Sequence, residues 1–122
     1  MSKTTVEKWQ DLVRKLIQLT HSKDLSWSDT NNTYVAKIND RKIHITKLFE
    51  FDGEINIRFS IYKEGPYGLD QLIDKFDDDD LTNIEYSEID AFLGTIQRSI
   101  TGADVELDSL LGDLDNLGKQ PN

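Results

Sequence analysis

The two histidines, His21 and His44, are the side chains best suited to acid–base or metal chemistry near neutral pH. The chain has no His-Glu-x-x-His motif, no Gly-x-Ser-x-Gly motif and no phosphate-binding loop that would build a reactive centre around them. It has no cysteine, which excludes thiolate catalysis, zinc–thiolate sites and disulfides. We therefore predict no catalytic residue, no metal site and no cofactor, and we do not expect an enzyme.

The acidic run at residues 77–80 invites comparison with a calcium-binding loop. Such loops need oxygen ligands at alternating positions, a glycine at the sharp turn and a closing bidentate glutamate. Counted from Asp78, the closing position falls on Ile89, and the glycine is missing. We interpret the run as a solvated acidic turn ahead of a helix N-terminus, where negative charge is favourable.

Binding of a small molecule or a nucleotide is a second kind of chemistry that the sequence permits. Lys47, Arg58 and Tyr62 fall in two stretches predicted to be adjacent strands, and together they could line a small cup on the polar face of a sheet. The other interpretation, which we favour, is the solvated side of an antiparallel sheet that buries one face. We keep these three residues as the alternative ligand-binding set.

The most regular pattern in the chain is a seven-residue repeat of apolar residues in its last third. Alternating steps of four and three predict a helix with one narrow apolar seam. A continuous helix of about 29 residues would run about 43 Å, longer than a domain of this size is wide. Either the helix breaks near Gly102 or its end projects. The seam consists of Ile89, Leu93, Ile96, Ile100, Ala103, Leu107, Leu110, Leu114 and Leu117.

The second half of that seam is the best candidate for a functional surface. Residues 89–100 are predicted to belong to the core, whereas residues 103–117 form a separable helical segment whether the helix breaks or its end projects. Acidic residues surround its apolar stripe, which suits a surface for another protein or for a second copy of this chain. The predicted partner-binding residues are Leu107, Leu110, Leu111, Leu114 and Leu117.

The rest of the chain is predicted to form the helix and strands against which this C-terminal helix packs. Residues 4–20 have helical apolar spacing, and Thr4 and Glu7 have the spacing of a capping box. Leu25-Ser26-Trp27 resembles a strand-like entry, and residues 28–32 have the composition of a turn. Strands follow at 33–39, 42–51 and 54–63, while residues 69–76 fit either a fourth strand, which we favour, or a helix.

These elements predict one α+β domain over residues 1–122, in two layers. A three- to four-stranded antiparallel meander is covered on its isoleucine face by the N-terminal helix and by the long, continuous or kinked, C-terminal helix. A three-residue loop should join the central strands, pairing Phe51 with Ile55, Phe49 with Ile57 and Ile45 with Ile61; a β-bulge near Leu48 is the alternative. Residues 118–122 are expected to be a disordered tail.

Charge is unevenly distributed along the chain, whose formal net charge is −9. Residues 1–63 carry +3 and residues 64–122 carry −12, so the two halves attract each other. Because the basic residues are spread out, a nucleic-acid partner is not expected. No run of about 18 apolar residues occurs, and the first residues lack the apolar region of a signal peptide. We expect a cytoplasmic protein with no membrane partner.

The closing segment reads Arg-Ser-Ile-Thr-Gly-Ala-Asp-Val-Glu-Leu-Asp-Ser-Leu-Leu. With the opening helix, the Leu-Ser-Trp entry and the polar meander, it resembles small uncharacterised bacterial proteins that close on Arg-Arg-x-Ala-Leu-x-x-Asp-x-x-Leu-Asp-x-Leu. Gly102 departs from that pattern, where a good helix former stands. The resemblance implies the fold and carries no activity. The positions in agreement are Arg98, Asp104, Leu107, Asp108 and Leu111.

The sequence thus predicts a non-catalytic protein-interaction module, of adaptor or inhibitor type. It would bind a protein partner, or itself as a homodimer, through the C-terminal helix. One alternative is a small-molecule or nucleotide-binding protein that uses the polar sheet face. The other is a phage-type inhibitor of host defence, with which the excess of Asp and Glu is compatible.

Overall fold

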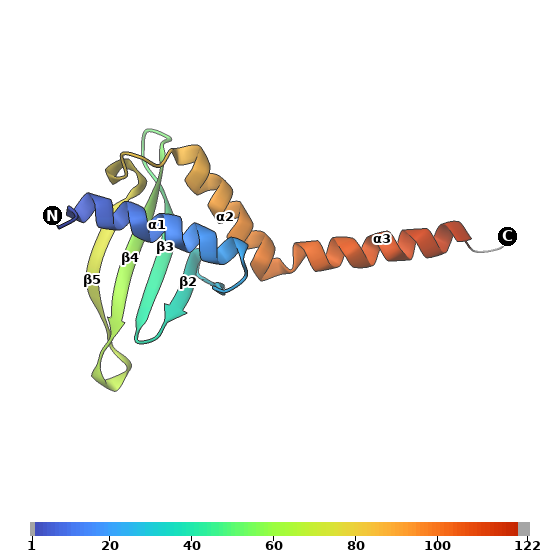
Figure 1. The fold of residues 1–122 in the computed structure, drawn as a ribbon, viewed down its shortest axis with the longest axis horizontal. Helices are drawn as coiled ribbons and strands as arrows, with labels where there is room; N and C mark the ends of the chain where they lie inside the picture. Colours follow the sequence, from blue (N-terminus) through green and yellow to red (C-terminus); the bar gives the residue numbers. More distant parts are fainter. Residues whose placement is uncertain (1, 120–122) are drawn as a thin grey trace.

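Five antiparallel strands form the sheet on which the molecule is built, and each pairs with its neighbours along the chain in the order β1-β2-β3-β4-β5. The computed structural model describes residues 2–119. Figure 1 shows the strands side by side, with α1 crossing one face of the sheet. The strands are β1 (Ser28–Thr30), β2 (Thr33–Ile38), β3 (Arg41–Phe49), β4 (Ile55–Glu64) and β5 (Asp70–Asp77).

Three α-helices complete the fold: α1 (Thr5–His21), α2 (Tyr86–Thr101) and α3 (Ala103–Lys119). Short 3-10 turns at Pro66–Gly68 and Asp78–Asp80 precede and follow β5. Helix α1 begins at the predicted capping box, in which Thr4 Oγ1 accepts the Glu7 N–H and the Glu7 carboxylate accepts the Thr4 N–H. Within residues 2–119, no helix has both the length and the apolar content needed to cross a membrane.

Helices α1 and α2 cover the same face of the sheet (Figure 1), and the core lies between the two layers. Alternation along each strand points every second side chain toward the helices, and in the central strands β3 and β4 most of these are isoleucine or phenylalanine. This confirms the predicted two-layer α+β arrangement. The buried residues include Val13 and Leu16 of α1, Ile43, Ile45, Ile57 and Phe59 of the sheet, and Ile89, Phe92 and Ile96 of α2.

The sheet has five strands, whereas three or four were predicted. Strand β1 forms within residues 28–32, which have the composition of a turn, and it pairs Thr30 with Thr33. The turn itself is only Asn31-Asn32, and both residues have positive φ, 50° and 63°. Two consecutive left-handed residues make the tight turn that joins antiparallel strands, and asparagine tolerates that conformation.

The pairing of β3 with β4 differs from the predicted register. The sequence predicts Phe51 opposite Ile55, but Ile55 pairs with Phe49, and every other pair is displaced by the same two residues. The loop is therefore longer than predicted, and a hydrogen bond of 2.9 Å from the Glu50 N–H to the Glu54 carbonyl closes it. A shift of two residues keeps every side chain on its face, so apolar alternation does not choose between the two registers.

Residues 69–76 form a strand rather than a helix, as favoured from the sequence. They belong mostly to β5, which pairs with β4 along its whole length. The pairing shifts between Ile61 and Tyr62, where Ile73 is the extra residue of a β-bulge. The bulge explains the helical spacing of the apolar residues here, because it interrupts the two-residue period of an ordinary strand.

The C-terminal helical region breaks at Gly102, as one of the two alternatives predicted, and the segment after the break also projects. Gly102 has a φ of 67° and caps α2 in the left-handed conformation, which glycine adopts without steric cost. The N-cap of α2 is Glu85, two residues before the predicted cap at Ser87. Of the tail predicted at 118–122, residues 120–122 lie outside the described residues, and α3 continues to Lys119.

Two phenylalanines near the β3–β4 hairpin give a matched test of this core. Phe59 is fully buried and stacks on Phe76 with ring centroids 5.0 Å apart, whereas Phe51 is fully exposed in the hairpin loop. Phe59→Ala should lower the free energy of unfolding by about 3–5 kcal/mol, because it leaves a cavity. Phe51→Ala should change it by less than about 0.5 kcal/mol. Urea unfolding followed by circular dichroism measures both, and equal losses would contradict the assigned core.

Candidate functional site

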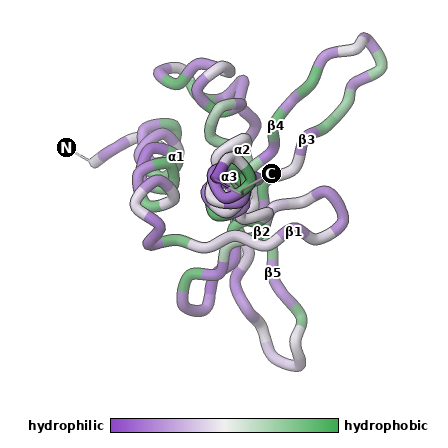
Figure 2. Tube along the Cα trace, turned by 90° about the vertical axis from the view of Figure 1, so that its right-hand side faces the viewer, coloured by the Kyte–Doolittle hydropathy of each residue, from purple (hydrophilic) through white to green (hydrophobic). Residues whose placement is uncertain are grey.

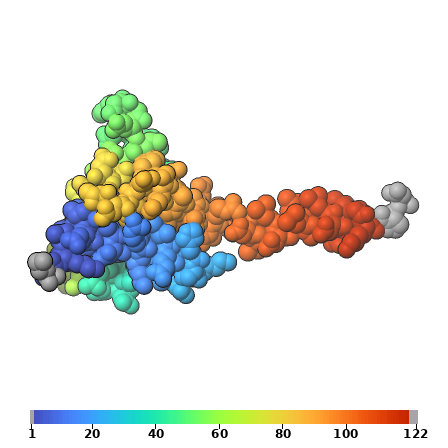
Figure 3. All heavy atoms as spheres, turned by 45° about the horizontal axis from the view of Figure 1, so that its top comes forward, coloured from blue at the N-terminus to red at the C-terminus, as the bar shows by residue number. Residues whose placement is uncertain are grey.

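Helix α3 extends away from the body of the molecule as a single rod. Figures 1 and 3 both show it reaching beyond the sheet and the other helices, and Figure 2 looks along it toward the body. No residue of α3 is buried. Because amphipathic helices normally bury their apolar stripe against another element, α3 is the element whose cover is missing from the described residues.

The five predicted partner-binding leucines lie together on α3. Residues three, four and seven positions apart share one side of a helix, so these side chains form a continuous surface that we call the leucine stripe. Each leucine is 48–62% exposed, although leucine is among the residues most often buried. The leucine stripe consists of Leu107, Leu110, Leu111, Leu114 and Leu117.

Carboxylates line both edges of the leucine stripe. Consecutive helix residues are about 100° apart, so the residues just before and just after a stripe leucine lie on opposite edges. The same arrangement of acid, leucine and acid occurs twice, seven residues apart, and places carboxylates on the same two edges each time. We call these segments the acid–Leu–acid triplets: Glu106-Leu107-Asp108 and Asp113-Leu114-Asp115.

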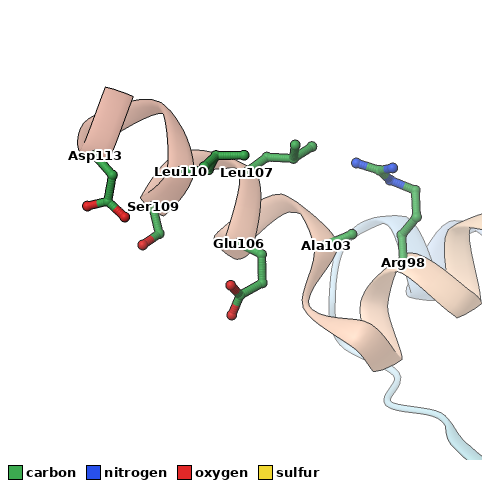
Figure 4. A pocket seen from close by; sticks show the side chains of 7 residues that line it. All are labelled: Arg98, Ala103, Glu106, Leu107, Ser109, Leu110 and Asp113. Atoms are coloured by element: carbon green, nitrogen blue, oxygen red, sulfur yellow. The ribbon is translucent and has the colours of Figure 1, made fainter. Parts of the chain in front are cut away.

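The triplet carboxylates face solvent. In Figure 4, Leu107 and Leu110 point to one side of α3, and Glu106 and Asp113 point to the other. Within residues 2–119, Asp104 is the one α3 carboxylate that takes part in an ion pair. Helix α3 has five acidic residues and one lysine, a net charge of −4 that nothing in the described chain neutralises beyond that pair.

The junction between α2 and α3 directs the rod. Helix α2 is anchored in the core, where Ile89 and Ile96 are fully buried. Gly102 ends it, and the Arg98 guanidinium then reaches across the break to donate a hydrogen bond to the Asp104 carboxylate. Exposed ion pairs contribute little stability, so this contact orients α3 more than it strengthens the fold. The leucine stripe is thus presented from a rigid base.

The alternative ligand-binding residues are not brought together. Lys47 pairs with Ile57, so its side chain points to the helix-covered face, where it lies 3.5 Å from the Asp90 carboxylate of α2. Arg58 lies on the open face and binds Asp77 through two hydrogen bonds. Tyr62 shares that face, but it lies four residues from Arg58, about 13 Å along a strand. No cup of the predicted composition forms.

The open face of the sheet nevertheless contains a polar hollow around His44. The hollow is lined in part by Val35, Lys42, His44 and Asp70, and the ring of Tyr62 lies 4.5 Å from that of His44. Lys42 and Asp70 form an ion pair of 3.0 Å at its rim. The buried Nε2 of His44 has no hydrogen-bond partner among the described residues. His21 lies at the end of α1, on the other side of the sheet.

The acidic residues 77–80 make hydrogen bonds and an ion pair within the fold. Asp78 is buried and its carboxylate accepts the Ile57 N–H at 2.9 Å, which ties the run to β4. Asp77 binds Arg58, and Asp80 accepts the Asp77 N–H in a capping box. Among residues 2–119, no group of three or more His, Asp or Glu side chains is placed to hold a metal ion.

Sequence reasoning missed two features of the exposed surface. The first is the tip of the β3–β4 hairpin, which stands out from the body in Figures 2 and 3 and exposes Phe49 and Phe51. The prediction placed Phe51 inside a strand, and only the longer loop exposes it. The second is the repeated acid–Leu–acid triplet, which is visible in the sequence at a spacing of seven residues.

The environment of His44 predicts a pH dependence of stability. Burial lowers the pKa of His44 below its usual value, the charge of Lys42 lowers it further, and Asp70 opposes both. The unfolded chain therefore takes up a proton at this position at a higher pH than the folded chain does. The free energy of unfolding should fall as the pH drops through about 6.5, the ordinary histidine pKa, and this loss is complete below the folded pKa.

His44→Gln should flatten this part of the pH profile, whatever the variant does to stability at neutral pH. Urea unfolding at pH values from about 5 to about 8, on the wild type and on the variant, provides the measurement. Equal slopes for the wild type and His44→Gln would show that His44 is not held neutral by its surroundings.

Two surfaces of residues 2–119 are the best candidates for binding: the leucine stripe with its acidic edges, and the polar hollow on the sheet. The first is apolar and extended, which suits a protein surface. The second is small and polar, which suits a small molecule. Comparisons of the chain with protein-family models, with curated proteins and with solved structures found no match. The resemblance of the closing segment thus assigns no family, and the function is inferred from these two surfaces.

Proposed function

We propose that this protein is a non-catalytic protein-interaction module that binds a protein partner through the leucine stripe of α3. The body, formed by the sheet with α1 and α2, acts as a rigid base, and α3 is the arm that docks. Such a construction suits an adaptor, which holds a partner, or an inhibitor, which covers a partner's surface.

The observation that carries this proposal is the exposure of five leucines on a helix with no buried residue. Full burial of one leucine side chain is worth about 1.5–3 kcal/mol, so a groove that covers the leucine stripe gains substantial free energy. Contiguous apolar patches of this kind mark interaction sites on the surfaces of folded proteins. An amphipathic helix that docks into an apolar groove is a common mode of protein recognition.

A second copy of the chain is the simplest alternative occupant. Ala103, Leu107, Leu110, Leu114 and Leu117 follow the alternating steps of four and three that let two helices pack side by side. Sedimentation of the intact chain separates the cases, because a homodimer changes the mass with protein concentration and a monomer does not.

Matched variants of the intact chain test the proposed function. Leu110→Asp with Leu114→Asp places two charges in the leucine stripe, whereas Val105→Asp places a similar charge on the opposite side of α3. Crosslinked capture from the source cell should lose its principal partner with the stripe variant and keep it with Val105→Asp. The stripe variant should also melt within about 2 °C of the wild type, because the replaced side chains are exposed.

Capture of the same proteins at the same level by the wild type and the stripe variant would overturn the proposed function. A large drop in melting temperature for the stripe variant would also count against it, because the leucines would then be packing within the monomer.

A small-molecule function is the second candidate, and the buried, unpaired His44 Nε2 beside the polar hollow supports it. If it holds, one member of a panel of nucleotides and other anionic metabolites should raise the melting temperature of the wild type. Lys42→Gln, which changes a residue that lines the hollow, should remove that increase, while Arg58→Gln, on the same face but outside the hollow, should keep it. A panel without effect, or an increase that survives Lys42→Gln, would exclude this candidate.

A further inference from the structure

We propose that the leucine stripe fits an apolar groove whose two rims carry lysine or arginine, on a protein other than a second copy of this chain. This inference rests on the proposed function and adds the chemistry of the partner. From Leu107 to Leu117 the stripe is about 15 Å long, which sets the length of groove that it fills.

The first argument is the repeated placement of carboxylates. In both acid–Leu–acid triplets, one carboxylate lies on each edge of the stripe, so a groove that receives Leu107 and Leu114 meets four carboxylates along its two rims. These four groups have no ion-pair partner among residues 2–119. An apolar or acidic rim would take them out of water without compensation, whereas a basic rim pairs with them.

The second argument concerns the second copy. In paired helices, the positions beside the seam decide the choice of partner, and here they are Asp104, Glu106, Leu111, Asp113 and Gly118. Two antiparallel copies would bring Glu106 of one helix beside Asp113 of the other, and the two carboxylates would repel each other. Two parallel copies would bring Glu106 beside Leu111, which gains no attraction. The net charge of −4 on each helix opposes both arrangements.

The third argument is that the chain does not supply the basic rim itself. Among residues 2–119, two cations lie close to the start of α3. Arg98 already binds Asp104 at the junction, and Lys23 lines a hollow with Asp104 and Val105, before the first acid–Leu–acid triplet. In Figure 4 the Arg98 guanidinium lies beyond the near end of the stripe, next to Leu107, and the rest of the stripe runs away from it. The complementary charge must therefore come from the partner.

The test uses the intact chain and two defined probes. Both are synthetic helical peptides of about three heptads with leucine along the seam; one has lysine on both flanks and the other has glutamate. The wild type should bind the lysine peptide at least about tenfold more tightly than the glutamate peptide, a difference of about 1.4 kcal/mol. The preference should shrink as sodium chloride is raised toward 1 M, because salt screens exposed charges.

A charge-reversal variant makes the result specific to the triplets. Replacing the four triplet carboxylates by lysine (Glu106→Lys, Asp108→Lys, Asp113→Lys and Asp115→Lys) should reverse the preference, so that the glutamate peptide binds more tightly. The control is Leu110→Asp, which should weaken binding of both peptides. Far-UV circular dichroism confirms that the variants keep their helices.

Equal binding of the two peptides, binding of neither, or an unchanged preference in the charge-reversal variant would overturn this inference. So would a concentration-dependent dimer of the wild type that Leu110→Asp dissociates. Those results leave the proposed function standing as long as the stripe variant loses its partner from the source cell. The proposed function fails separately, when that variant captures the same proteins as the wild type.

Discussion

Burial of the isoleucine-rich face of the sheet is the constraint on which the rest of the molecule depends. The meander of β1 to β5 has one apolar face, and α1 and α2 are the two helices that cover it. Both helices pack their apolar residues against this face, as the complete burial of Val13 and Ile96 shows. Once α1 and α2 cover this face, it leaves no place for a third helix, and several apolar side chains that stay exposed on the body, such as Phe49, Phe51 and Leu69, lie in or beside loops. The chain turns at Gly102, and α3 continues into solvent.

Much of the fold could be predicted from the sequence, because it depends on local periods. The capping box at Thr4, the alternation of β4 and the break at Gly102 are short-range signals. The register of β3 against β4 could not be predicted in this way, because two registers that differ by two residues bury the same side chains. Strand β1 was missed because its residues have turn composition and gain strand structure only by pairing with β2.

The candidate surfaces, too, could be predicted from the sequence only in part. Spacing alone predicts which leucines share one side of α3, but their exposure depends on the size of the body and on the cap at Gly102. Lys47, Arg58 and Tyr62 do not form one site, and the sequence already contains the reason. Lys47 has the same parity along its strand as Ile43 and Ile45, so it belongs to the covered face, away from Arg58 and Tyr62. The buried nitrogen of His44 emerges only from tertiary packing.

The isolation of α3 has a consequence for how strongly it can hold anything. A solitary helix of this length is close to the helix–coil midpoint in water, and Gly112 and Gly118 lower its helical propensity further. Part of the free energy gained when the leucines are covered must then offset the conformational entropy lost as the backbone stops fraying. Association through such an arm is weaker than its apolar area alone implies, and release is correspondingly fast. If α3 docks as we propose, its partners are therefore exchanged rather than kept.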